Sequence, residues 1–430
     1  MTFYIESLGC AKNQVDSEFL IAELEARGLQ WVEEPEAADT IVVNTCGFIT
    51  SAKDQSIQTS LSFKSRFPNK KIIMLGCLVQ RYGEELAREM QEIDGFVGLD
   101  DVSSLWRLIA ADQRGSVAVS RKRFLSYPGS VYVKIAEGCS NHCSYCAIPL
   151  IRGELKSRPA DEIFEEIQQL IETGAVEINL VAQDLASYGK DRGKTGLVDL
   201  VKSIAGLKGS FWLRMLYLHP DHFPAELPEV VASDPRILPY FDVPFQHASR
   251  AILEKMGRSG SAESYTALVR GIRDQIPDAV IRSTFLVGFP GETEQDLEAV
   301  LAFQRSAALD WVGVFAYSKE EGTPAFDYSG GVRKSVAERR KQRVEENQIG
   351  ISEERLDRQV GRTLDVLVEE PVREEKLYLG RAYLQAPEVD GLVVIKAETL
   401  EPGRIYPVRI ERRVGIDLEA SLARQRPASG

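Results

Sequence analysis

Three cysteines stand in one short segment of the chain, at Cys139, Cys143 and Cys146. Their spacing is C-x3-C-x2-C, and three thiolates on one loop can bind three irons of a four-iron, four-sulfur cluster. No fourth cysteine follows in this segment, so one iron keeps a coordination position for a small molecule, whereas a cluster held by four cysteines mostly transfers electrons. A zinc knuckle is the alternative, although zinc sites usually pair C-x2-C with a second ligand pair. The spacing of this loop triad therefore favours a cluster that activates a small molecule.

The other three cysteines, Cys10, Cys46 and Cys77, each follow an apolar segment typical of a β-strand, and a helical pattern comes after each of them. The strand-like segments are residues 3–5, 40–45 and 71–76. A repeated strand–helix order predicts a parallel sheet, whose strands end at one common edge. We therefore expect this upstream triad to converge and to hold a second cluster. Three separately buried cysteines are the alternative, since free cysteine packs as a small hydrophobe.

The two triads use all six cysteines of the chain, which leaves none for a disulfide framework. No apolar signal segment opens the sequence, and no run approaches the roughly 18 apolar residues that cross a membrane. These features predict a soluble protein of the reducing cytoplasm, with no membrane partner. The formal net charge of −12 makes a nucleic acid an unfavourable partner and a basic macromolecule a better one.

The elements that must position these cysteines divide the 430-residue chain into three predicted domains. Residues 1–125 form the parallel α/β domain of the upstream triad, and a linker with Arg121, Lys122 and Arg123 closes it. Residues 126–358 carry six strand-like segments with helical patterns between most of them, then a long polar helix. Those segments are residues 131–135, 177–181, 211–216, 238–243, 280–287 and 311–316. Residues 359–430 read as short strands of a small all-β barrel. The predicted fold class is α/β.

The loop triad, the upstream cysteine domain and the C-terminal barrel together resemble the radical S-adenosylmethionine (SAM) methylthiotransferases, and the resemblance covers the whole chain. Five motifs are similar to the RimO-like branch, which modifies an aspartate of ribosomal protein S-twelve. They are residues 9–18, 182–189, 217–222, 242–247 and 386–391. The MiaB-like branch, which modifies an adenosine of tRNA, usually has His-x-Pro-x-Gln-Ser where this chain has Asp-x-Pro-x-Gln-His from Asp242 to His247. The segment between Cys139 and Cys143 lacks the arginine that is often seen there.

The resemblance implies an open six-unit (βα) barrel, a TRAM-like C-terminal domain, two [4Fe-4S] clusters and SAM as cofactor. It also implies cofactor contacts for six residues besides the cysteines. Tyr145 packs beside SAM, Gln183 and Asp184 hold its ammonium, Arg214 pairs with its carboxylate, Gln246 reaches its ribose or the substrate, and Gly288 lies near its adenine. Loop packing for Tyr145 and a salt bridge within the barrel for Arg214 are equally open interpretations.

The resemblance further implies three partners: the basic protein S-twelve, free or in the small subunit, an electron donor such as flavodoxin, and a sulfur donor. Acidic residues of the C-terminal barrel suit a basic partner. They are Glu369, Glu370, Glu374, Glu375, Glu388 and Asp390. A tRNA methylthiotransferase is the first alternative, and we expect it to need a basic barrel with exposed aromatic rings. A non-catalytic two-cluster electron carrier or scaffold is the second, and it needs eight cysteine ligands where the chain has six.

Overall fold

The computed structural model describes residues 1–99, 101–110, 127–193, 196–372 and 375–423, so the predicted linker Arg121 to Arg123 lies outside the described residues. The chain forms two compact units, which we describe separately. The first comprises residues 1–125, 136–156 and 318–326, and the second comprises residues 126–135, 157–317 and 327–430. Both cysteine triads therefore belong to the first unit. The domain boundaries near residues 125 and 358 stay predictions. No helix of the described residues is long and apolar enough to cross a membrane.

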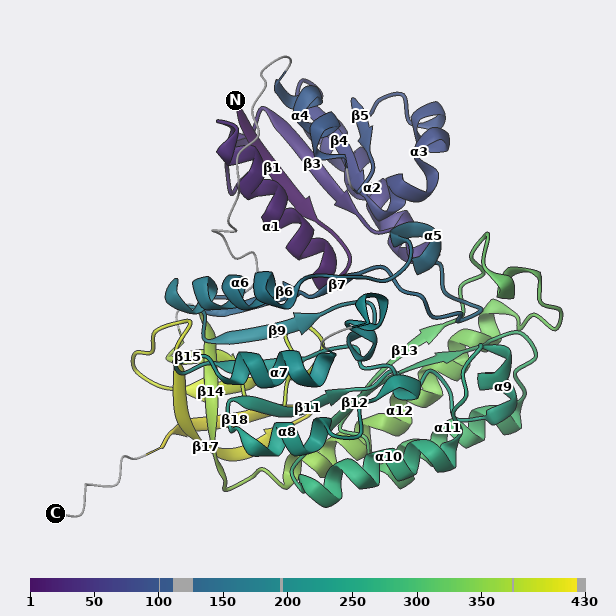
Figure 1. Ribbon diagram of the computed structural model, residues 1–430, viewed down its shortest axis with the longest axis vertical. Coiled ribbons are helices and arrows are strands. Elements are labelled where there is room, and N and C mark those ends of the chain that lie inside the picture. Colours follow the sequence, from purple (N-terminus) through teal and green to yellow (C-terminus); the bar gives the residue numbers. More distant parts are fainter. Residues whose placement is uncertain (100, 111–126, 194–195, 373–374, 424–430) are drawn as a thin grey trace. The chain divides into compact units, whose positions relative to one another are not determined.

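The first unit is built on a parallel five-stranded sheet with the order β2-β1-β3-β4-β5. Its strands are β1 (Thr2–Ser7), β2 (Gln30–Trp31), β3 (Thr40–Thr45), β4 (Lys71–Gly76) and β5 (Gly95–Val97). Helices α1 (Ala11–Ala26) and α4 (Val102–Ala110) cover one face, and α2 (Thr50–Arg66) and α3 (Cys77–Glu89) cover the other (Figure 1). Burial on both faces explains the apolar runs of β3 and β4. The predicted parallel α/β domain is confirmed.

The second unit contains a parallel six-stranded sheet in which each strand pairs with the next one in sequence. The strands are β6 (Ser130–Lys134), β9 (Glu177–Val181), β10 (Trp212–Met215), β11 (Ile237–Asp242), β12 (Val280–Val287) and β13 (Trp311–Ala316). The intervening helices are α6 (Ala160–Glu172), α7 (Leu197–Ala205), α8 (Leu227–Ser233), α9 (Arg250–Lys255), α10 (Ala262–Gln275) and α11 (Glu294–Ala307). The sequential order confirms the open six-unit barrel. The polar helix α12 (Lys334–Asp357) then packs on β13 and α11.

A closed five-stranded barrel completes the second unit, with the order β14-β15-β16-β18-β17. Its strands are β14 (Thr363–Val372), β15 (Leu377–Arg381), β16 (Val393–Lys396), β17 (Ile405–Val414) and β18 (Asp417–Leu422). Figure 1 shows this barrel at the amino-terminal ends of the strands of the six-stranded sheet, away from their arrowheads. The predicted small β-barrel is confirmed.

Buried ion pairs join the closed barrel to the sheet. Glu177, the first residue of β9, binds Arg214 of β10 (Oε1 to Nε, 3.1 Å) and Arg381 of β15 (Oε2 to Nη2, 2.7 Å). Arg381 also binds Glu369 of β14 (Nε to Oε1, 2.6 Å), and none of the four side chains is more than 2% exposed. Burial by itself raises the pKa of Glu177, but Arg381 and Arg214 outweigh it and lower that pKa to about 2.

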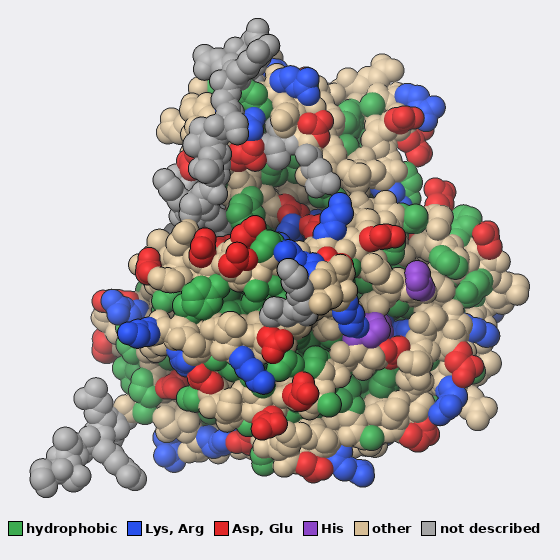
Figure 2. Space-filling model, viewed as in Figure 1, with side chains coloured by type: hydrophobic (Ala, Val, Ile, Leu, Met, Phe, Trp, Pro, Cys, Tyr) green, Lys and Arg blue, Asp and Glu red, His purple; other side chains and the backbone are tan. Residues whose placement is uncertain are grey.

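A second buried pair in the same unit involves Asp390, which accepts hydrogen bonds from Tyr240 (2.5 Å) and Arg282 (3.4 Å). The expectation that Glu369 and Asp390 present their charges to a partner is therefore wrong, because each neutralises a buried arginine. Glu370, Glu375 and Glu388 are exposed, and Glu374 lies outside the described residues. On the face drawn in Figure 2, acidic and basic side chains are interspersed.

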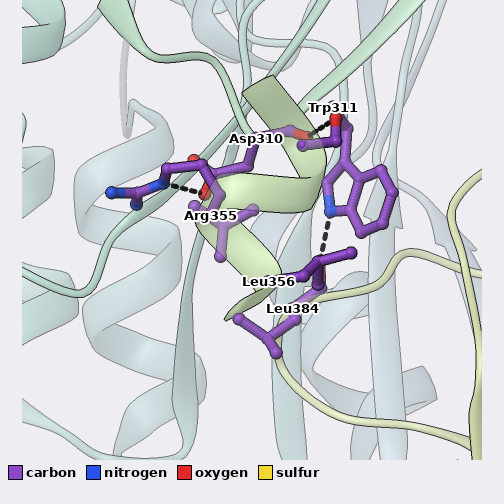
Figure 3. Close-up of a pocket in the computed structure, with 7 residues that line it drawn as sticks. Asp310, Trp311, Arg355, Leu356 and Leu384 are labelled. Atoms are coloured by element: carbon purple, nitrogen blue, oxygen red, sulfur yellow. Dashed lines mark hydrogen bonds and ion pairs between the residues drawn. The ribbon is translucent and has the colours of Figure 1, made fainter. Parts of the chain in front are cut away.

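A small pocket lies where α12, the start of β13 and the closed barrel meet (Figure 3). Trp311 donates a hydrogen bond from Nε1 to the Leu384 carbonyl (2.6 Å), and Arg355 binds Asp310 (2.6 Å). The cavity has room for about one water molecule. It also lies at the amino-terminal ends of the strands, whereas ligands of parallel sheets bind at the carboxyl ends. This pocket is therefore a packing gap.

Candidate functional site

The upstream triad gathers at the carboxyl ends of three neighbouring strands of the first unit. Cys10 caps α1 after β1, Cys46 follows β3, and Cys77 begins α3 after β4. The loops approach so closely that a Cβ on Gly9 would lie 2.8 Å from Cys46 Cβ, and one on Gly47 would lie 2.7 Å from the Cys77 carbonyl oxygen. The order β1-β3-β4 thus brings these three cysteine loops together.

Asn13 ties these loops to one another, a role that sequence reasoning missed. Its Nδ2 donates to the carbonyls of Leu8 (2.9 Å) and Thr45 (3.0 Å), which precede Cys10 and Cys46. Its Oδ1 lies 3.5 Å from Cys77 Sγ and 4.0 Å from Cys10 Sγ. Its position in the first turn of the helix after Cys10 was the available signal.

Within the upstream triad Cys77 is buried, and Cys10 and Cys46 are half-buried. Burial raises the pKa of Cys77 to about 11, against the opposing effect of Arg152, and burial also raises the pKa of Cys46. Thiolates are the form that binds iron, so an incoming cluster has to displace these protons.

Backbone hydrogen bonds at Cys139 and Cys146 hold the two ends of the loop triad in place. The Cys139 N–H donates to the Gly153 carbonyl (3.1 Å), and the Cys146 N–H donates to that of Cys143 (3.1 Å). Gly138 has φ +71, and a Cβ there would lie 2.1 Å from the Glu154 carbonyl oxygen, so the loop closes only with glycine at this place. All three thiols are partly exposed. Tyr145 is half-buried directly before the last of them.

These two triads fit four-iron clusters by donor chemistry: each offers three cysteines on constrained loops and no fourth. Among the described residues, no three His, Cys, Asp or Glu side chains form a ligand group for a single metal ion. Three cysteines without a fourth suit a cluster with one open iron, whereas a structural zinc site has four protein ligands.

A segment that follows β13, residues 318–326, contacts α2, α3 and the loop triad within the first unit. Glu320 is 2% exposed and binds Lys53 of α2 (2.8 Å) and Arg81 of α3 (2.7 Å). Farther along, the Ala325 N–H donates to the Ser144 carbonyl inside the loop triad (2.8 Å). No local pattern predicts this contact, because the partners lie far apart in the chain.

Apart from Tyr145, which lies in the first unit, the predicted SAM-binding residues belong to the second unit. Four of them follow the ends of three strands. Gln183 and Asp184 follow β9, Gln246 follows β11, and Gly288 follows β12. Gln183 and Gln246 are half-buried, and Gln246 adopts φ +67, a strained conformation for a residue other than glycine. Gly288 has φ +76 and donates its N–H to Glu292 Oε2 (2.6 Å). These residues thus share the carboxyl edge of the sheet.

Asp184 stabilises the turn in which it lies by accepting hydrogen bonds from its neighbours. The side chain is buried and accepts hydrogen bonds from the Ala186 N–H (2.9 Å), the Ser187 hydroxyl (2.6 Å) and the His219 N–H (3.2 Å). These contacts fix the loops after β9 and β10 against each other. A positioning role for Asp184 therefore fits the contacts better than a direct bond to a ligand.

Arg214 lies inside β10 rather than at its end. Its guanidinium binds Glu177, donates to the Tyr383 carbonyl (3.0 Å) and stacks over Tyr240 with no exposed surface. The salt bridge that stood as the second interpretation is what the structure shows, and we propose no cofactor contact for this residue.

Two histidines at strand ends carry their hydrogen on Nε2. His219 Nδ1 accepts from the Asp221 N–H (3.2 Å), and His247 Nδ1 accepts from the Ser249 N–H (2.9 Å). Burial lowers the pKa of each to about 4, so both are neutral near pH 7. His247 has no exposed surface and packs near Glu292, which indicates a structural role.

Comparison with known proteins gives the class. Residues 2–98 match the uncharacterized protein family UPF0004, residues 133–303 the radical SAM superfamily and residues 360–422 the TRAM domain. The radical SAM methyltransferase TsrM from Kitasatospora setae superposes with a TM-score of 0.56 at 14% identity, over 75% of this chain and 73% of that chain. Apo OxsB, a cobalamin-dependent SAM radical enzyme, gives 0.52 at 9% identity, over 80% and 56%. Such likeness shows the fold alone. With the matched regions, it defines a radical SAM enzyme with a TRAM domain.

Three full-length relatives give the family. The chain is 41% identical to the ribosomal protein uS12 methylthiotransferase RimO of Treponema denticola, over 96% of this chain and 98% of that protein. The RimO proteins of Carboxydothermus hydrogenoformans and Aquifex aeolicus are 42% and 40% identical, over 95% and 97% of this chain and 97% and 96% of theirs. The chain belongs to the RimO family of ribosomal protein uS12 methylthiotransferases, which confirms the resemblance inferred from its motifs.

Proposed function

We propose that this protein adds a methylthio group to the β-carbon of an aspartate in ribosomal protein uS12, the protein called S-twelve above. The observation that carries this proposal is identity of about 40% over nearly the whole chain with proteins named for that activity. The two cysteine triads and the three regions that match known families further support the proposal. An aspartate β-carbon bears no leaving group, so its substitution needs chemistry that a cofactor supplies.

The loop triad and the upstream triad each hold one [4Fe-4S] cluster in this proposal. When bound, the clusters and SAM supply the electron, the radical and the sulfur-bearing iron that the reaction needs. The chain's own contribution is to present three thiolates at each place, which leaves one coordination position of the cluster without a cysteine. Asn13 and the segment of residues 318–326 keep the two sets of loops in shape.

SAM binding falls to residues at the carboxyl edge of the six-stranded sheet. We assign Gln183 to the ammonium, Gln246 to the ribose or the substrate, and the Gly288 turn to the adenine, with Tyr145 beside the cofactor. Asp184 positions the loop that carries Gln183. The turn needs glycine at position 288, because a Cβ there would lie 2.4 Å from Ala337 Cβ.

The reaction also needs an electron donor such as flavodoxin and a donor for the inserted sulfur. Because the substrate is a ribosomal protein, we place the reaction in the cytoplasm. We propose that a basic substrate contacts the exposed acidic residues Glu370, Glu375 and Glu388. The proposed contact excludes Glu369 and Asp390, because both are buried against arginines.

Anaerobic turnover with two substrates tests this function. Reconstituted protein, SAM, a reductant and a sulfide source are incubated with purified uS12 in one reaction and with unmodified tRNA in another. We expect peptides of uS12 to gain the mass of a methylthio group on one aspartate, and tRNA nucleosides to stay unchanged. Modification of tRNA with uS12 untouched would move the chain to the nucleic-acid branch.

A further inference from the structure

Arg152 connects the two cysteine triads of the first unit. It ends the short helix α5 (Ile148–Arg152), which begins two residues after Cys146. Its Nη2 lies 3.3 Å from Cys77 Sγ, 2.6 Å from Asn13 Oδ1 and 2.9 Å from Asp16 Oδ2. Its Nη1 donates to Glu137 Oε1 at 2.9 Å. A cation that belongs to the loop-triad segment thus touches a sulfur of the upstream triad.

The guanidinium is held by burial and by charge. Its side chain is 2% exposed, and a buried cation is tolerated only when it is paired and hydrogen-bonded. Asp16 and Glu137 supply that pairing from either side. Nη2 has two hydrogens for three acceptors, so the sulfur contact competes with Asn13 and Asp16. It strengthens when Cys77 is a thiolate, because hydrogen bonds to ionised acceptors are about twice as strong as neutral ones.

A cation beside a ligand sulfur has a definite effect on a cluster. Reduction adds an electron to the cluster and its thiolates, and a fixed positive charge stabilises the more negative state. Hydrogen bonds to the sulfurs and the net charge of the surroundings are the levers by which proteins set cluster potentials. The placement of Arg152 therefore bears on the redox state of whatever iron–sulfur group Cys77 holds.

We propose that Arg152 is a positioning residue that holds the Cys77 thiolate by a charge-assisted hydrogen bond and raises the reduction potential of the upstream cluster. The same contact ties the loop-triad segment to the upstream triad. The inference rests on the proposed function only in taking a cluster to be bound by the upstream triad. It differs from simple bracing, since bracing leaves the potential where it is.

Arg81 offers a matched control in the same unit. It is another buried arginine, 6% exposed and paired with Glu320, and it also donates to the carbonyls of Gly47 and Glu321. It resembles Arg152 in burial and ion pairing, but the contacts just named are to oxygen and none is to a cysteine. Arg81→Met therefore reports the loss of a buried ion pair without the loss of a cation at sulfur.

The experiment uses the full chain with the loop triad changed to alanine, so that any cluster present belongs to the upstream triad. Arg152→Met, Arg152→Lys and Arg81→Met are added singly to this parent. After anaerobic reconstitution, iron is counted and the potential is measured by redox titration followed by electron paramagnetic resonance. We expect Arg152→Met to disfavour reduction at least about tenfold, which is about 59 mV for one electron. Arg152→Lys should recover part of this shift, and Arg81→Met should match the parent.

Equal potentials for Arg152→Met, Arg81→Met and the parent, with iron retained, would overturn the inference and leave the proposed function standing. A parent without iron would instead overturn the upstream cluster itself, and the inference with it. If Arg152→Met loses its iron, Arg152→Lys decides, because it keeps a cation at this position. Iron retained in Arg152→Lys with a potential below that of the parent supports the inference. Iron retained at the parent's potential, or iron loss in Arg152→Lys and Arg81→Met as well, shows bracing alone and overturns it.

Discussion

Glu177 gives the sharpest test of how the second unit is held together. Glu177→Gln removes the carboxylate that binds both Arg214 and Arg381 and leaves two buried guanidinium groups with less counter-charge. The pKa of Glu177 is lowered from 4.5 to about 2. At 1.36 kcal/mol per unit, this difference is worth about 3 kcal/mol of stability. This contribution agrees with the typical cost of removing one partner from a buried ion pair, which is about 3–5 kcal/mol.

The sign of the pH dependence follows from the direction of this shift. The folded state holds the Glu177 proton more weakly than the unfolded state does, so the contribution is fully present above pH 4.5. It is lost as the pH falls from 4.5 toward 2. The difference in unfolding free energy between the parent and Glu177→Gln should therefore be largest near neutral pH and shrink in acid.

Native-state hydrogen exchange followed by mass spectrometry measures this locally. Peptides from β14 and β15 should exchange about 100-fold faster in Glu177→Gln at neutral pH, as a 3 kcal/mol loss implies. Glu401→Gln is the control, because Glu401 and Arg404 form an exposed pair whose loss should change nothing measurable. Exchange in Glu177→Gln that stays within about twofold of the control would refute the reasoning.

Three further predictions concern the cofactors and the substrate. Changing the loop triad to alanine should halve the iron of the reconstituted protein, from about eight per chain, and abolish reductive cleavage of SAM; full iron retention would contradict the assignment. Changing the upstream triad to alanine should leave SAM cleavage in place but remove all methylthiolated product, and product at the parent's yield would show that these cysteines are structural. Glu370→Lys with Glu375→Lys should weaken uS12 binding mostly at low salt, because salt screens exposed charges within about 10 Å at 0.1 M. The exposed Glu338→Lys and Glu346→Lys on α12 are the matched control, and an equal loss there would show that only net charge matters.

The sequence was sufficient for most of the fold because the pattern that defines each element is local. Strand and helix segments alternate along the chain, and that alternation alone predicts parallel sheets. Single strands of the small barrel are harder to predict. The six residues of β18 follow a tight turn at Gly415, and such a short segment gives a weak periodic signal.

The site was predictable where residue type decides the chemistry and not where distant partners decide it. Cysteine spacing indicated the cluster ligands without any structure. Arg214 fitted both a cofactor contact and a salt bridge, and the choice depended on Glu177 and on Arg381, which lies 204 residues from Glu177. Glu369 and Asp390 read as exposed because acidic residues usually are, and only the folded chain shows the arginines that bury them.

The contacts of Arg152 could not be predicted from the sequence either. Arg152 lies only six residues beyond Cys146, and an arginine near cluster ligands is a recognisable cation. Its partners Asn13 and Asp16 lie in α1, and Cys77 begins α3. The sequence does not show which cation will meet which thiol. Contacts across loops of different strands need the register of the whole sheet.

The most direct test of the central claim is the state of uS12 in cells. A bacterial host that lacks its own enzyme of this family is given either the parent chain or the variant with the upstream triad changed to alanine. Mass spectrometry of uS12 from purified ribosomes should then show a methylthio group on one aspartate with the parent and none with the variant. Unmodified uS12 in cells that make the iron-loaded parent, together with new methylthiolated nucleosides in their tRNA, would contradict the account.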